Sequence, residues 1–168
     1  MINPEYCQMM ARYNAWQNAG LREMVKDIPT QDLTKDRGAF FGSILGTLNH
    51  LLWADTLWIS RLDGGASTDV AMKDAPFMTP TAAVWSGDRF RMDGRISLWA
   101  KQVKALDLVG DLTWYSGVMQ RRMSKPKALC VMQIFNHQTH HRGQVHAMLT
   151  QIGLKPQDTD IPFMPEGF

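Results

Sequence analysis

The sequence predicts an all-α protein built as a bundle of four long helices, and three observations support this fold class. Apolar residues recur every three or four positions in four separate stretches, which is the period of an amphipathic helix. Glycine and proline gather between these stretches, where helices end. The chain of 168 residues is 45% hydrophobic and 20% charged, which suits one core, so we expect a single domain over residues 1–168.

The first two helices are expected in the N-terminal third of the chain. One covers residues 5–27, and its Asn14 is expected to hydrogen-bond where two helices cross. Residues 28–42 hold a proline and two glycines and are predicted to form an irregular connection. The second helix should start at Ser43, a good N-cap, and end near Leu62, just before a pair of glycines.

The third helix is predicted after a long loop. Residues 64–81 show little periodicity, and a loop of this length in a compact domain often covers a site. The helix itself should run from Thr81 or Ala82 to Leu108. Residues 111–123 change character and suggest two short extended segments around Ser116 and Gly117, a strand-like piece before the last helix.

The last helix is expected from residue 125 to Ile152, with Gly153 as its C-terminal stop. The tail beyond it contains three prolines and is not expected to be helical. Its apolar side chains should pack back on the bundle: Ile161, Phe163 and Met164.

Composition argues against several classes of partner. The net charge is only +2 and basic residues are scattered apart from Arg121 and Arg122, so no nucleic-acid footprint is present. The sequence has no apolar stretch of about 18 residues to span a membrane. The first residues lack the basic and then apolar run of a signal peptide, so we expect a cytoplasmic protein in which Cys7 and Cys130 stay as buried thiols.

Four of the five histidines lie between residues 134 and 146. His137 and His141 are four residues apart, so on a helix they share one face, the core side, and are close enough to bind one metal ion. His140 falls about 100° from His141 and should reach only the rim of such a site, whereas His146 falls on the opposite face.

Three further residues bear on this site. His50 lies at the edge of the apolar stripe of the second helix, and we expect it to complete a three-histidine metal site. Gln144, one turn beyond His141, is expected to hydrogen-bond a bound water or substrate, and Gly143 to allow a close approach. Asp55 points at the core and needs a partner, either an arginine or backbone donor or a ligand histidine.

Three sequence segments together resemble the DinB family, also called DinB/YfiT-like, over nearly the whole chain. They are Tyr-Asn-Ala-Trp-Gln-Asn at residues 13–18, Leu-Asn-His at residues 48–50 followed by Trp53 and Trp58, and Asn-His at residues 136–137 continuing to His-Arg-Gly-Gln at residues 141–144. The resemblance implies a homodimeric up-down-down-up bundle. It also implies a zinc or nickel ion held by three histidines, which by position are His50, His137 and His141.

The same resemblance suggests a reaction class, because better-understood members of the family are transferases that use a low-molecular-weight thiol, such as mycothiol or bacillithiol. Three neutral imidazoles with open coordination positions are typical of a catalytic zinc site, which lowers the pKa of a bound water or thiol. We therefore expect a metal-dependent enzyme that activates a thiol or water against a small electrophilic substrate. His50, His137 and His141 would act through the metal, with Gln144 and His140 beside it.

Two alternatives remain open from the sequence. The protein could be a non-catalytic stress protein that binds a metal or small ligand, or a dimeric bundle whose histidines only fill polar niches. Acyl and phosphoryl transfer are poorer interpretations, because no Ser-His-Asp order and no glycine-rich phosphate loop accompany the histidines.

Overall fold

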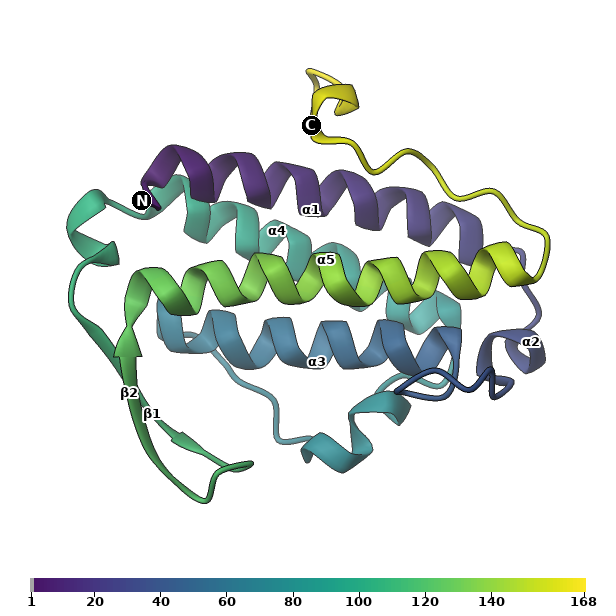
Figure 1. Ribbon diagram of the computed structural model, residues 1–168, viewed down its shortest axis with the longest axis horizontal. Helices are drawn as coiled ribbons and strands as arrows, with labels where there is room; N and C mark the ends of the chain where they lie inside the picture. Colours follow the sequence, from purple (N-terminus) through teal and green to yellow (C-terminus); the bar gives the residue numbers. More distant parts are fainter. Residues whose placement is uncertain (1) are drawn as a thin grey trace.

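The computed structural model describes residues 2–168 and confirms the predicted bundle (Figure 1). Its four long helices are α1 (Pro4–Val25), α3 (Ile44–Asp63), α4 (Ala82–Gln102) and α5 (Lys127–Gln151). Shorter elements lie between and after them: α2 (Thr30–Thr34), the 3₁₀ turns η1 (Met72–Phe77), η2 (Ala105–Leu108) and η3 (Ile161–Phe163), and the strands β1 (Asp111–Ser116) and β2 (Arg121–Pro126).

Side-chain caps fix where three of the long helices begin. The side chain of Asn3 accepts a hydrogen bond from the backbone N–H of Tyr6 at 2.9 Å, at the start of α1. Ser43 does the same for α3 and Thr81 for α4. Each cap satisfies a backbone donor that has no partner within its helix, so the starts predicted at Ser43 and Thr81 are confirmed.

The core lies between two closely packed helix pairs, α1 with α4 and α3 with α5. Large side chains with exposed fractions of 1% fill the space between the pairs, among them Leu48, Trp85 and Phe135. The indole of Trp85 also donates to the backbone carbonyl of Leu48 at 3.2 Å, which joins α4 to α3. No helix within residues 2–168 is long and apolar enough to cross a membrane.

The third long helix is shorter than predicted. It ends at Gln102, because Val103 adopts an extended conformation with φ −61° and ψ 133°. The chain then forms η2, where Leu106, inside the predicted range of the helix, is 80% exposed. The expected connection at residues 28–42 likewise contains the short helix α2, whose Leu33 is fully buried.

The strand-like segment is an antiparallel hairpin, in which Trp114 of β1 lies opposite Met123 of β2. Because β2 continues to Pro126, α5 begins at Lys127, two residues later than expected. The hairpin is fastened to α3 by aromatic contacts: Trp114 and Trp58 pack edge to face at 5.4 Å, and the guanidinium of Arg61 lies over both rings.

The tail returns along α1, as Figure 1 shows. The hydroxyl of Tyr13 donates to the carbonyl of Thr159 at 2.7 Å, and the amide of Gln17 donates to the carbonyl of Asp158 at 2.8 Å. Met164 packs on the core, but Phe163 is 63% exposed. The tail does lie back along α1, but mainly through polar side chains of α1. The packing expected of Ile161 and Phe163 is wrong, since both are exposed.

A layer of buried polar side chains crosses the middle of the bundle. Arg89 of α4 pairs with Asp55 of α3 at 2.6 Å and with Asp93 at 2.8 Å. The side-chain amide of Asn14 donates to Asp93 at 3.1 Å, and Arg142 of α5 donates to Asn14. These contacts confirm the arginine partner predicted for Asp55 and the helix-crossing role predicted for Asn14.

Candidate metal centre

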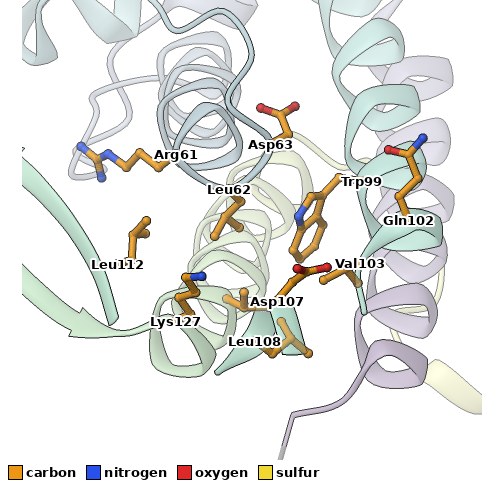
Figure 2. A pocket seen from close by; sticks show the side chains of 11 residues that line it. Arg61, Leu62, Asp63, Trp99, Gln102, Val103, Asp107, Leu108, Leu112 and Lys127 are labelled. Carbon is orange, nitrogen blue, oxygen red and sulfur yellow. The ribbon is translucent and has the colours of Figure 1, made fainter. Parts of the chain in front are cut away.

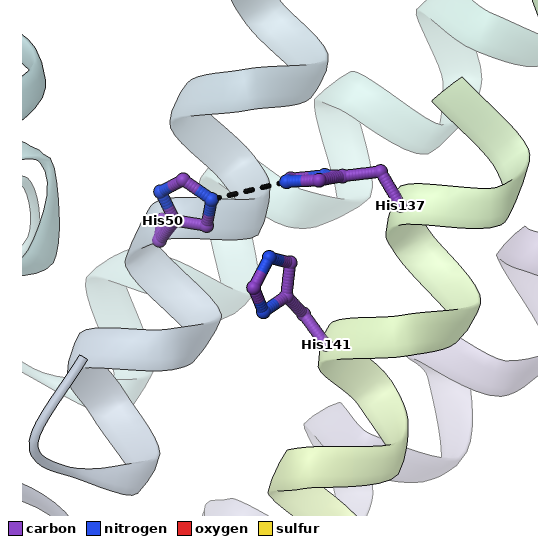
Figure 3. Close-up of side chains that lie close together, drawn as sticks. All are labelled: His50, His137 and His141. Carbon is purple, nitrogen blue, oxygen red and sulfur yellow. Dashed lines mark hydrogen bonds between the residues drawn. The ribbon is translucent and has the colours of Figure 1, made fainter. Parts of the chain in front are cut away.

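Three histidines from two helices meet in the bundle, as Figure 3 shows. His50 lies on α3, and His137 and His141 lie one turn apart on α5. The Nε2 atoms of His50 and His137 are 3.1 Å apart, and the ring of His141 is centred 4.4 Å from that of His137. Ligand atoms of all three lie within 4.8 Å of one another, so the trio selected by sequence does converge.

These distances fit a shared metal ion. Zinc binds imidazole nitrogen at about 2.0–2.1 Å, so two tetrahedral ligands lie about 3.4 Å apart, close to the observed 3.1 Å between His50 and His137. Two neutral imidazole nitrogens at this distance must either share one proton or face a common cation. The three histidines could therefore hold a metal ion.

Burial keeps the three rings in the form that binds metals. Loss of solvent, and after it the neighbouring His137 and His141, lower the pKa of His50 to about 3. The same loss of solvent, followed by the proximity of His141, lowers the pKa of His137 to about 4. Burial also lowers the pKa of His141. All three imidazoles are thus neutral at neutral pH, with lone pairs free for a ligand bond.

Gln144 lies against one of these rings. Its Oε1 accepts a hydrogen bond from Nδ1 of His141 at 2.7 Å, which leaves Nε2 of His141 unprotonated and turned toward the other two histidines. Gln144 also lines the adjoining cavity, where we expected it to hydrogen-bond water or substrate. Its observed contact is with the histidine, whose orientation it fixes.

Phe41 covers the cluster and was missed by the sequence analysis. Its ring stacks on His50 with the centroids 3.7 Å apart and the planes 20° from parallel. The connection that carries it passes so close to α3 that a Cβ on Gly46 would lie 2.5 Å from the carbonyl oxygen of Phe41. A glycine in the first turn of a helix, just after two adjacent phenylalanines, was the available signal.

A cavity of about 550 Å³ opens over the three histidines. Its floor and one side come from α3 and α5, Phe40 and Phe41 form another side, and η1 contributes Met72, Lys73 and Pro76. Since η1 belongs to the long segment at residues 64–81, part of this predicted loop does line the histidine cavity.

Hydrogen bonds from α3 hold η1 in place on both sides of Lys73. The side-chain amide of Asn49 donates to the carbonyls of Pro76 and Thr79, both at 3.0 Å. The indole of Trp53 donates to the carbonyl of Val70 at 2.8 Å. The residues next to His50 in sequence therefore build the wall that faces it.

The other residues singled out in the last helix lie in different settings. His140 is exposed and lines the cavity, with its ring 4.8 Å from that of His141, so the expected rim position is confirmed. His146 does not line the cavity and is half-buried; burial, and after it the charge of Arg142, lowers its pKa. No atom lies within 4 Å of a Cβ built on Gly143, so among the described residues no other helix approaches it closely.

A second cavity, of about 350 Å³, lies at the hairpin end of the bundle (Figure 2). Three of its four charged side chains, all but Lys127, already have structural partners. Asp63 accepts two hydrogen bonds from Arg95, Asp107 accepts one from the backbone of Lys104, and Arg61 stacks on two tryptophans. The histidine cavity, whose donor atoms face open space, is the better candidate for chemistry.

Fold and site together define a class: a helical bundle in which two helices bring three histidines together at a cavity. Residues 1–167 match the sequence model of the DinB family. The chain belongs to the DinB family, as the resemblance of its three motifs indicated.

Individual relatives agree with this assignment. The chain is 25% identical to Protein DinB of Bacillus subtilis (strain 168) over 161 residues, which cover 93% of this chain and 91% of that protein. It is also 25% identical to the uncharacterized protein YizA of the same organism over 129 residues, 77% of each chain. A crystal structure of a DinB-like protein from Bacillus cereus ATCC 10987 has a TM-score of 0.63 and 17% identity, covering 85% of this chain and 90% of the other. This likeness supports the fold.

Proposed function

We propose that this protein binds a divalent metal ion, zinc or nickel, through His50, His137 and His141 and is a metal-dependent enzyme acting on a small electrophilic substrate. The observation that carries the proposal is the meeting of three neutral imidazoles at the floor of a cavity of about 550 Å³. A closed structural site would use four protein ligands, whereas three ligands beside a cavity leave room for a reactant.

The chemistry follows from the donor set and its surroundings. A divalent metal ion in this position supplies Lewis acidity that brings the pKa of a thiol or water toward the physiological range. Gln144 holds Nδ1 of His141 and so keeps its other nitrogen available. Phe41 stacks on His50 and η1 contributes further apolar wall, so a small substrate in the cavity is partly removed from bulk water.

Metal content of the untagged protein is the first test. We expect about one zinc or nickel ion per chain by elemental mass spectrometry, and loss of that ion in His50→Ala and in His141→Ala. His146→Ala, on the same helix as His141 but outside the cluster, is the matched control and should retain the metal. Wild-type protein without metal after supplementation with both ions would overturn the proposal.

Turnover separates an enzyme from a binding protein. The metal-loaded protein should accelerate the reaction of a low-molecular-weight thiol with a small electrophile such as 1-chloro-2,4-dinitrobenzene, and His137→Ala should not. Stoichiometric metal without turnover of any thiol or water reaction would favour the alternative of a non-catalytic metal- or ligand-binding protein. The homodimer implied by the family is a further part of the proposal and is checked by light scattering.

A further inference from the structure

The histidine cavity is lined by a positive charge and by no negative one. Among the described residues that line it, Lys73 is the only one with a full charge at neutral pH, and none is an aspartate or glutamate. Within residues 2–168 the ammonium group of Lys73 forms no ion pair with a carboxylate. The cation is therefore available to a molecule that enters the cavity.

The backbone that carries Lys73 is fixed, unlike that of a typical surface lysine. The bonds from Trp53 to the carbonyl of Val70 and from Asn49 to that of Pro76 clamp η1 to α3 on either side of it. Ala75, two residues beyond Lys73, is fully buried under the same segment. Lys73 is exposed and its side chain can move, but the fixed backbone keeps the ammonium group within reach of the cavity that this residue lines.

The rest of the wall strengthens an interaction with this charge. Phe40, Phe41, Met72 and Pro76 surround the opening with apolar groups, which lower the local dielectric constant and offer contact to a hydrocarbon body. His140 adds a ring N–H donor at the rim. A small anion is the ligand that this combination of cation, donor and apolar wall accommodates.

We propose that the cavity selects small molecules that carry a carboxylate in addition to their metal-binding atom, and that Lys73 is the residue that binds this carboxylate. The inference rests on the proposed function above. It restricts the thiols that the protein would accept to those that also carry a negative charge. Lys73 thus acts as a specificity-determining residue that does not touch the reacting atom.

The test compares two thiols that differ in one charge, 3-mercaptopropionate and its methyl ester, on cobalt-loaded protein. Binding is followed by the visible absorption of cobalt, which changes when a thiolate joins the ion. We expect the acid to bind about tenfold more tightly than the ester, as for a hydrogen bond to a charged group, with the preference shrinking as sodium chloride is raised. Lys73→Met should reduce the affinity for the acid to that for the ester, and Lys73→Arg should keep the preference.

Lys101→Met is the matched control, because Lys101 is exposed on α4 and does not line the cavity. Equal affinities for acid and ester in the wild type, or a preference that survives Lys73→Met, would overturn the role of Lys73 while leaving thiol binding intact. A cobalt spectrum unchanged by either thiol would instead overturn the thiol proposal. In that case the same pair is compared by amide NMR shifts of Lys73 and Phe41, where shifts that do not favour the acid reject the anion site as well.

Discussion

At the scale of single residues, the hydrogen bond from His141 to Gln144 is the contact most open to experiment. Gln144→Ala removes the acceptor that fixes the ring of His141. We expect zinc affinity to fall about 10- to 100-fold, the usual effect of losing a group that orients a metal ligand. Competition with a chromophoric chelator measures the change.

Gln133→Ala provides the comparison for this variant. Gln133 is exposed on α5 and does not line the cavity, so its replacement should leave zinc affinity unaltered. If Gln144→Ala bound zinc as tightly as the wild type, the orienting role of Gln144 would be refuted.

Gly46 permits the contact between α3 and the connection that carries Phe41. A methyl group at Gly46 would meet the carbonyl oxygen of Phe41 at 2.5 Å, so Gly46→Ala must displace that backbone. We expect it to lower the free energy of unfolding by about 1–3 kcal/mol, as overpacking does. Urea denaturation measures the loss.

Gly143→Ala is the matched substitution, because nothing lies within 4 Å of its added methyl group. It should be neutral or stabilising by up to about 1 kcal/mol through helix propensity. If both substitutions changed the free energy of unfolding equally, the close contact at Gly46 would not affect stability.

The sequence predicts the three histidines but not everything around them. Helical spacing places His137 and His141 on one face, and only packing of α3 on α5 brings in His50, for which the family motif was the additional signal. Gly46 was the one signal for Phe41, because the position of Phe41 depends on the path of an irregular connection. Lys73 was likewise invisible, since no periodicity marks a short 3₁₀ turn.

At the scale of elements, the pair of Asp63 and Arg95 joins the C-terminal end of α3 to α4. Hydrogen bonding to Arg95 lowers the pKa of Asp63 in the folded protein. Because the pKa of Asp63 is lower in the folded than in the unfolded protein, its ionised form stabilises the fold. This contribution is present above about pH 4 and is lost as the pH falls through the folded-state pKa of Asp63.

We therefore expect Arg95→Met to lower the free energy of unfolding by about 1 kcal/mol at neutral pH, since the ion pair is partly exposed. Below pH 4 the loss should be smaller. Urea denaturation across pH 2–7 gives the comparison with the wild type. Arg91→Met, which removes a more exposed pair with Asp88, should have little effect at any pH. A cost independent of pH would mean that Arg95 contributes only through its contact with the carbonyl of Ala66.

Element boundaries were predictable where a local signal marks them. Ser43 and Thr81 accept from the first turn of their helices, and Gly64 adopts a left-handed φ of 70° at the end of α3. The end of α4 has no such marker, because Val103 leaves the helix to reach a buried position at the end of the bundle. Tertiary packing decides that boundary, so periodicity alone placed it six residues too late.

At the scale of the whole molecule, the buried layer of Asp55, Arg89 and Asp93 ties α3 to α4 at mid-height. Arg89→Met leaves two buried carboxylates without their cation. We expect a loss of about 3–5 kcal/mol in the free energy of unfolding at neutral pH, typical of breaking a buried ion pair on one side. Chemical denaturation of the metal-free protein measures it without interference from ligand binding.

Part of this loss should return at low pH. Burial raises the pKa of Asp93, so Asp93 takes up a proton more readily in the folded protein, and protonation removes the uncompensated charge. If Arg89→Met lowered the free energy of unfolding by less than about 1 kcal/mol, as replacement of an exposed arginine does, the buried layer would not contribute substantially to stability.

The way in which the tail is held has a consequence for how this sequence can change. Tyr13 and Gln17 donate hydrogen bonds to the backbone carbonyls of Thr159 and Asp158. Every amino acid carries such a carbonyl. The side chains at positions 158 and 159 can therefore drift freely over evolutionary time while the tail keeps its course. The constraint falls instead on α1, where exchange of Tyr13 or Gln17 removes one of the hydrogen bonds that hold the tail.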